Sequence, residues 1–157
     1  MRGLFRLLVI TALMSMPPIS ASFAGNAKAT KNIAKIHRVV IQVDQNDPAV
    51  MNLALNNATN IFEYYLKKGE PVEINIVTYG PGLHMLRDTS PVRDRIKQLK
   101  DLAFPGKIEF SACNNTKQAM EKREGQPIAI LPDARLVPSG VVTLTELQEK
   151  GWSYVRP

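Results

Sequence analysis

The only cysteine of this 157-residue chain, Cys113, stands between a short apolar stretch and a polar stretch that is rich in helix-capping residues, beginning with Asn114 and Asn115. A thiol becomes a nucleophile when it ionises. Its free pKa of about 8.5 falls at a helix amino terminus, because unpaired N–H groups and the helix dipole stabilise the thiolate. We place Cys113 one or two residues before the cap of the next helix, where this chemistry is available.

Two other interpretations of Cys113 stay open. Unpaired cysteine is among the most buried residue types, so the side chain could be an inert packing residue at the end of a strand. An odd cysteine in an oxidising compartment could also form a disulfide with another molecule.

Polar residues follow two other predicted strands. Asn46 lies in the segment Asp44-Gln45-Asn46-Asp47, and His84 follows the turn Gly80-Pro81-Gly82. Because parallel strands deliver their following loops to the same rim of a sheet, these residues and Cys113 are candidates for a common pocket. Structural explanations stay open for several of them. A lone histidine is commonly a surface or hydrogen-bonding residue, and Asn114, Asn115 and Thr116 are good helix caps.

The elements that must position these residues are short β-branched stretches and longer stretches of helical period. Strands are predicted at 36–43, 72–79, 107–112, 134–137 and 152–155. Met51, Leu55, Ala58, Phe62 and Tyr65 form one apolar stripe at helical spacing, with Asp47 as the cap and Gly69 as the end.

Three more helices are predicted: one opens at Ser90-Pro91 and runs to Ala103, one runs from Asn114 or Asn115 to Gly125, and one opens with a capping box of Thr143 and Glu146. Strands that alternate with helices predict an α/β three-layer sandwich with a mostly parallel sheet. The stretch PIAILP at 127–132 fits a strand and a buried turn equally well.

Residues 1–24 have the pattern of a secretory signal peptide: two arginines, an apolar run, then small residues before a cut that we place after Ala24. The apolar run is shorter than the roughly twenty residues of a membrane span. Residues 25–35 are polar and are expected to form a flexible lead-in, and 36–157 are expected to form a single domain. We therefore expect a periplasmic or secreted protein whose mature form is not in the membrane.

Several classes of function are disfavoured. Removing residues 1–24 takes away Arg2 and Arg6 and no acid, so the net charge falls from +6 to +4, and no basic stripe with aromatic support indicates nucleic-acid binding. Two distant histidines and one cysteine make no metal set. Flavodoxins share the predicted architecture, but DQNDP after the first strand is no phosphate-binding loop, so no cofactor is expected.

The stretches TYGPGLHML, FSACNNT, VPSGVVTLTELQEKGWSYVRP and HRVVIQV resemble the DsrE/DsrF-like family, in its secreted bacterial branch. The resemblance covers about residues 36–157. It implies a flavodoxin-like sheet, homo-oligomers that are commonly trimers or hexamers, and kinship with the sulfur-relay subunits DsrE and TusD, in which one cysteine carries sulfur as a persulfide. Some members carry histidine where this chain has Tyr79, which leaves His84 as the only nearby imidazole.

The leading hypothesis is an exported sulfur-handling protein in which Cys113 takes sulfur from a sulfane-sulfur donor and yields it to an acceptor thiol. The amides of Asn114 and Asn115 and the backbone donors of the helix would stabilise the sulfur anion, and His84 would relay a proton. Tyr79 and Asn46 are further candidate substrate-binding residues. The alternative is a noncatalytic ligand-binding or oligomeric assembly module in which the cysteine is structural.

Overall fold

The computed structural model of the chain describes residues 35–103 and 107–157. The predicted signal peptide, and the lead-in up to residue 34, lie outside the described residues. The described part contains a five-stranded sheet in the order β4-β3-β2-β1-β5. All neighbouring strands pair in parallel: β1 (His37–Val43), β2 (Val72–Thr78), β3 (Lys107–Cys113), β4 (Ala134–Val137) and β5 (Ser153–Val155).

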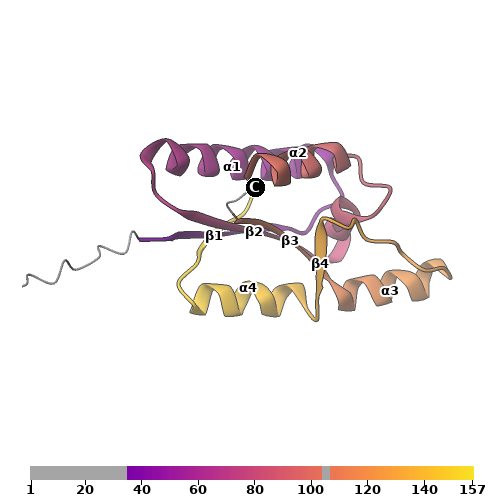
Figure 1. Cartoon of the computed structure of the whole chain (residues 1–157). Coiled ribbons are helices and arrows are strands. Elements are labelled where there is room, and N and C mark those ends of the chain that lie inside the picture. Colours follow the sequence, from indigo (N-terminus) through magenta and orange to yellow (C-terminus); the bar gives the residue numbers. More distant parts are fainter. Residues whose placement is uncertain (1–34, 104–106) are drawn as a thin grey trace, which may run out of the picture. The chain divides into compact units, whose positions relative to one another are not determined.

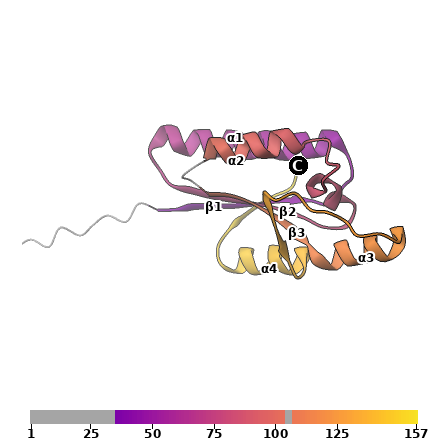
Figure 2. The same ribbon diagram turned by 45° about the vertical axis from the view of Figure 1, so that its right-hand side comes forward.

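Helices lie on both sides of this sheet (Figure 1). They are α1 (Pro48–Lys68), the 3₁₀ helix η1 (Gly80–Leu86), α2 (Arg93–Ala103), α3 (Asn114–Glu124) and α4 (Gly140–Glu149). In both Figure 1 and the turned view of Figure 2, α1 and α2 lie on one side of the sheet and α3 and α4 on the other. The predicted α/β layered fold is confirmed, and the sheet is entirely parallel.

Helix α1 ends where its sequence predicts. The Asp47 carboxylate accepts a hydrogen bond of 2.7 Å from the backbone N–H of Ala49, which satisfies one of the free donors of the first turn. Gly69 ends the helix with φ 67°, in the left-handed region that glycine enters without a steric penalty. Lys67 and Lys68 lie in the last turn, where positive charge is favoured by the helix dipole.

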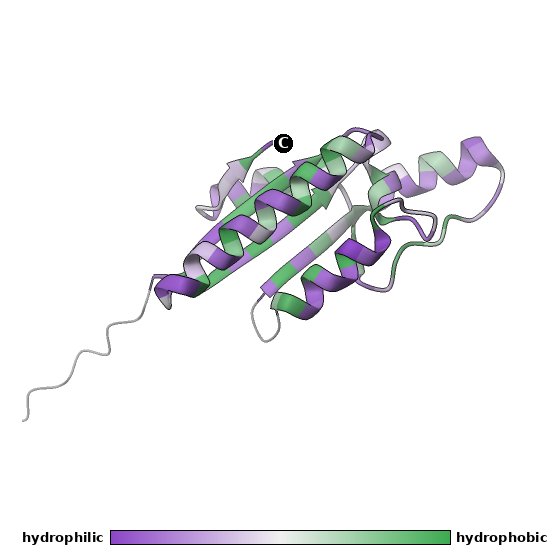
Figure 3. Ribbon diagram, turned by 90° about the horizontal axis from the view of Figure 1, so that it is seen from above, coloured by the Kyte–Doolittle hydropathy of each residue, from purple (hydrophilic) through white to green (hydrophobic). Residues whose placement is uncertain are grey.

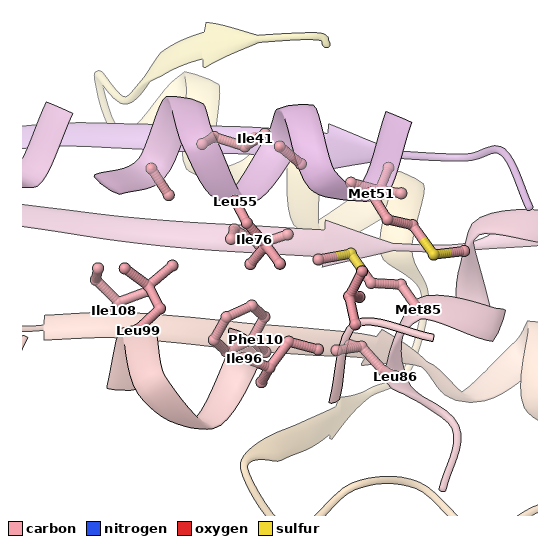
Figure 4. Packing of buried hydrophobic residues seen from close by; sticks show 14 of the residues in the cluster. Ile41, Met51, Leu55, Ile76, Met85, Leu86, Ile96, Leu99, Ile108 and Phe110 are labelled. Carbon is pink, nitrogen blue, oxygen red and sulfur yellow. The ribbon is translucent and has the colours of Figure 1, made fainter. Parts of the chain in front are cut away.

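The large apolar core lies between the sheet and the pair α1 and α2. Figure 4 shows how Leu55 and Met51 of α1 and Ile96 of α2 meet the side chains of the strands beneath, including Ile76 and Phe110. Viewed from the α1 and α2 side, hydrophilic residues are frequent along both helices, while the strands beneath are largely hydrophobic (Figure 3). The apolar stripe of each helix therefore faces the core.

The α4 side of the sheet has a much smaller core. Its apolar cluster is formed by the buried residues Val40, Val77 and Leu144. The same face carries a buried polar pair, in which the Ser111 hydroxyl donates to the Asn75 side-chain oxygen at 2.9 Å. Side chains alternate between the two faces along a strand, so the residues that follow this pair, two positions on, face the same side.

Sequence analysis placed each strand to within one residue, but it was wrong about the start of α4. Thr143 and Glu146 form no capping box, because the helix begins earlier, at Gly140 after Ser139. The Thr143 hydroxyl instead donates back to the Ser139 carbonyl at 2.9 Å. Without a capping side chain at Ser139, the first N–H groups of α4 remain available to neighbours.

Two further segments differ from expectation or resolve an open choice. The segment after β2, expected as a loop, is the 3₁₀ helix η1, which packs so closely that a Cβ on Gly82 would lie 2.1 Å from the Val43 carbonyl oxygen. In the stretch 127–132 only Ile130 pairs, by an isolated antiparallel bridge to Arg87, so this stretch is not a strand of the sheet. Within the described residues no helix has the length and apolar character needed to cross a bilayer.

Candidate functional site

Cys113 is the last residue of β3 and the N-cap of α3 itself, rather than a residue before the cap. Its sulfur accepts a hydrogen bond of 3.4 Å from the backbone N–H of Thr116. The sulfur thus occupies the position of the oxygen of a capping serine or threonine, where the free N–H groups of the first turn point.

A second helix begins beside the same sulfur. The backbone N–H of Asn115 donates to the Pro138 carbonyl at 3.2 Å, which ties the start of α3 to the turn before α4. Gly140, the first residue of α4, directs its N–H toward the sulfur of Cys113. Two helix amino termini therefore converge on one thiol, and both favour negative charge there.

These contacts shift the ionisation of the thiol. Burial alone raises the pKa of Cys113, but the Thr116 hydroxyl and the backbone N–H groups of Gly140, Thr116 and Asn115 outweigh it and lower the pKa. The Thr116 hydroxyl oxygen accepts from the Gly80 N–H at 3.0 Å, which leaves its own proton free to donate to the sulfur. Hydrogen bonding to the charged form is the cause of the shift.

Access to the thiol is narrow, because Cys113 is only 4% exposed. Gly140 packs against it so closely that an added Cβ would lie 3.3 Å from the Cys113 Cβ and 2.8 Å from the Tyr79 Cβ. A side chain at position 140 would therefore displace one of its neighbours. The glycine allows α4 to bring its first N–H close to the sulfur.

Tyr79 connects the thiol region to the other edge of the sheet. Its ring is half-buried, and burial together with the nearby Asp44 and Tyr154 raises the pKa of its hydroxyl, against a smaller opposing effect of Arg156. The phenol therefore stays protonated. Around it, the Gln42 amide donates to Asp44 at 2.9 Å and Arg156 pairs with Asp44 at 3.0 Å.

A pocket of about 290 Å³ lies next to the thiol, between η1 and α3. It forms where the segments after β2 and β3 turn toward opposite faces of the sheet, which is where open α/β sheets leave a crevice. It is lined by Asn46, Gly80, Pro81, His84, Thr116, Ala119, Met120 and Arg123. Thr116 thus lines the pocket and also contacts the sulfur, while Cys113 itself does not line it.

The two walls of this pocket are fastened at both ends. At one end the Gly80 N–H donates to the Thr116 hydroxyl. At the other end Arg87, which follows η1, forms a two-pronged ion pair with Glu124 at the end of α3, with both N–O distances at 2.9 Å. This paired geometry fixes orientation as well as distance. The pocket is therefore a defined feature of the fold.

His84 lines the pocket in its neutral form. Burial and the nearby Arg87 lower the pKa of His84, Arg123 adds to this, and the carboxylate of Glu124 opposes it only in part. Neutral imidazole carries one donor nitrogen and one acceptor nitrogen. The side chain can therefore bind either a donor or an acceptor on a ligand at neutral pH.

The structure brings together most of the residues singled out in the sequence. His84 and Asn46 share the pocket, and Tyr79 packs beside Cys113. The backbone N–H of Asn115 helps to lower the pKa of Cys113, while its hydrogen bond of 3.2 Å goes to the Pro138 carbonyl. Among the side-chain hydrogen bonds of residues 35–103 and 107–157, none joins an amide of Asn114 or Asn115 to Cys113. Of the donors expected at the sulfur, the backbone N–H of Thr116 forms a hydrogen bond to it.

Three residues that contribute to the site were missed in the sequence. These are Thr116, Gly140 and Arg123, none of which was among the site residues predicted from the sequence. The repeated small and capping residues in NNT and PSG were the available signal, since both segments follow strands of a parallel sheet. Across the described ranges, no group of three or more histidine, cysteine or acidic side chains could hold a metal ion.

The chain was compared with known proteins in sequence and in structure. No curated protein matches the chain in sequence. A solved structure from Methanobacterium thermoautotrophicum, the protein of unknown function MTH1491, is similar with 30% identity and a TM-score of 0.62, over 77% of this chain and 99% of that one. BT1422 from Bacteroides thetaiotaomicron, also of unknown function, shares the fold at 17% identity and a TM-score of 0.50, over 76% of this chain and 93% of that one.

The family assignment follows from the match in sequence as well as in structure. The DsrE/DsrF-like family model covers residues 35–157, which includes every described strand and helix. The chain belongs to the DsrE/DsrF-like family.

Proposed function

We propose that this chain is an exported sulfur-handling protein in which Cys113 binds or relays sulfane sulfur as a persulfide. Membership of the DsrE/DsrF-like family suggests a role related to sulfur relay. The observation that carries the proposal is the convergence of the α3 and α4 amino termini on the sulfur, with hydrogen bonds that lower the pKa of Cys113 despite its burial.

The chemistry follows from this environment. The Cys113 thiolate attacks the outer sulfur of a sulfane-sulfur donor, the donor's S–S bond breaks, and Cys113 keeps one extra sulfur as a persulfide. An acceptor thiolate then attacks that terminal sulfur and releases the Cys113 thiolate. The N–H groups of Thr116 and Gly140 stabilise the anion before and after transfer.

The test uses the described domain with inorganic polysulfide as donor. We expect the intact mass of the protein to rise by one sulfur atom, and the increment to disappear on treatment with a small thiol. Cys113→Ser is the matched control, since serine also caps helices well and keeps the fold. A wild-type protein without the increment, or a Cys113→Ser variant with it, contradicts the proposal.

One observation favours a second function, a noncatalytic binding or assembly module: Cys113 is 4% exposed and does not line the neighbouring pocket. Alkylation of the thiol over a range of pH separates the two functions. Reaction of Cys113 with a midpoint well below the free value of about 8.5 supports sulfur chemistry. A thiol that reacts only after unfolding supports the structural role.

Export is proposed from residues 1–24 alone. Sequencing the amino terminus of the protein recovered from a periplasmic fraction tests it, with Gly25 expected as the first residue. Assembly into a trimer or hexamer is proposed from the family resemblance, supported by exposed apolar side chains on neighbouring elements: Leu136 is 51% exposed, Val141 55% and Val142 51%. Light scattering during size-exclusion chromatography would measure the mass of the assembly.

A further inference from the structure

The pocket beside Thr116 has a definite charge preference. Of the described residues that line it, Arg123 is the only one with a formal charge at neutral pH, and none is acidic. The carboxylate next to Arg123 in the chain, that of Glu124, is engaged by Arg87 at 2.9 Å on both oxygens and lies 4.0 Å from Arg123. Two guanidinium groups face one carboxylate, so the pocket attracts an anion.

The pocket is also too large for a small inorganic anion alone. Its volume of about 290 Å³ corresponds to roughly ten water molecules at about 30 Å³ each. Pro81, Ala119 and Met120 give it an apolar wall, while Asn46, His84 and Thr116 offer donors and acceptors. This lining suits an organic molecule that has polar groups along its length and a carboxylate at one end.

The position of Thr116 connects this pocket to the reactive sulfur. Its side chain lines the pocket, and its backbone N–H donates to the Cys113 sulfur at 3.4 Å. Arg123 lies seven residues further along the same helix, about two turns away at 1.5 Å per residue. A ligand held by Arg123 therefore extends along α3 toward the residue that contacts the thiol.

We propose that this pocket binds the carboxylate-bearing body of a low-molecular-weight organic persulfide, such as an amino-acid or short-peptide persulfide, and so selects the sulfur donor of Cys113. The inference rests on the proposed function. Arg123 binds the carboxylate, and Thr116 and His84 contact the polar groups nearer the sulfur.

The transfer step balances without a further reagent. The Cys113 thiolate attacks the terminal sulfur of R–S–SH, and a new S–S bond forms at Cys113. The S–S bond of the donor breaks, R–S⁻ leaves, and it takes a proton from solvent. The product is Cys113–S–SH, and the donor is recovered as the thiol R–SH, which is free to leave the pocket.

The experiment measures Cys113 persulfide formation by intact mass with two donors, glutathione persulfide and inorganic polysulfide. Arg123→Gln removes the cation, and Lys122→Gln removes an exposed charge next to it that does not line the pocket. We expect Arg123→Gln to raise the half-saturating concentration of glutathione persulfide about fivefold, as for a solvent-exposed ion pair. Polysulfide loading should be unchanged, as should both reactions of Lys122→Gln.

A second variant and a competition measurement test the pocket independently of Arg123. Ala119→Phe places a ring in the pocket from the exposed side of α3, and should block loading by glutathione persulfide but not by polysulfide. S-methylglutathione, which cannot transfer sulfur, should compete only with glutathione persulfide. Equal behaviour of wild type and Arg123→Gln toward glutathione persulfide, with polysulfide still loading Cys113, overturns this inference alone. Failure of both donors to load wild-type Cys113 overturns the proposed function and this inference together.

Discussion

The two faces of the sheet bury different kinds of side chain. The face under α1 and α2 is lined by large aliphatic and aromatic side chains such as Ile41, Ile76 and Phe110, all fully buried. The face under α4 has a small apolar cluster of Val40, Val77 and Leu144 and a buried polar pair, Asn75 with Ser111. The first face supplies most of the apolar burial that stabilises the fold, and the second face carries the sulfur of Cys113.

This difference explains how the pKa of a nearly buried thiol can be lowered despite its burial. A thiolate placed among aliphatic side chains would lose its hydration with nothing in exchange, which would raise its pKa. Cys113 lies on the α4 side, where Gly140 admits the start of a second helix and Thr116 supplies both a hydroxyl and an N–H. Donors replace the water that burial removes.

The largest effect on stability should come from truncating one buried side chain on each face of the sheet in turn. Phe110→Ala removes a 1% exposed ring from the large core and should lower the free energy of unfolding by about 3–5 kcal/mol, measured in urea. Leu144→Ala on the α4 side should cost about 2 kcal/mol, at the low end for such substitutions, because the small cluster has fewer neighbours to leave behind. Equal losses would contradict the asymmetry between the faces.

A second prediction concerns the close approach at Gly140. Gly140→Ala places a Cβ 2.8 Å from the Tyr79 Cβ, so the tyrosine or the helix start must shift, at a cost of about 1–3 kcal/mol in unfolding free energy. The same shift moves the Gly140 N–H from the sulfur, so the pH midpoint of Cys113 alkylation should rise. Val141→Ala, at the next and exposed position, should change neither measurement. An unchanged midpoint in Gly140→Ala would mean that α4 does not stabilise the thiolate.

A third prediction isolates the Thr116 hydroxyl. Thr116→Val should reduce the thiolate fraction below the alkylation midpoint about tenfold, since a hydrogen bond to a charged group is worth about 1.5 kcal/mol or more. The more basic thiolate is also more nucleophilic, which leaves a decrease of about threefold in the alkylation rate. Thr116→Ser keeps the hydroxyl and should react like wild type. If valine and serine behave alike, the backbone donors alone set the pKa.

The sequence predicts the face under α1 and α2 better than it predicts the face that carries Cys113. The strands and α1 follow from local patterns: β-branched runs, an apolar stripe from Met51 to Tyr65, and ends marked by Asp47 and Gly69. The α/β class then follows from the alternation of strands and helices. The position of Cys113 at a strand end before a helix was also predicted, and the structure makes it the cap itself.

The rest of the site depends on contacts between segments far apart in the chain. Nothing local to Gly140 indicates that its N–H meets the sulfur of a residue in another strand, and the sequence offered the Thr143 capping box as a more regular start for the same helix. The pocket likewise requires η1 and α3 to be fastened together by Arg87 and Glu124. Such pairings follow from packing, which single-sequence patterns do not encode.

The smallest predicted effect concerns the ion pair between Arg87 and Glu124 and the dependence of its stabilising effect on pH. The hydrogen bond and charge of Arg87 lower the pKa of the Glu124 carboxyl. A folded-state pKa below the unfolded value of about 4.3 contributes stability that is fully present above that pH and is lost as the pH falls through the folded-state pKa. Glu124→Gln should therefore unfold at slightly lower urea concentration than wild type at pH 7, and the difference should shrink at pH 3.

Glu146→Gln is the matched control, because Glu146 is exposed on α4 and forms no ion pair with any of the described residues. It should show no such difference between wild type and variant at either pH. A Glu124→Gln variant whose deficit persists at pH 3 would mean that the carboxyl acts through packing rather than charge. The pocket walls would then be held by the Gly80 to Thr116 hydrogen bond and by apolar contacts, and the polar side of the molecule would rely on its ion pair less than its geometry indicates.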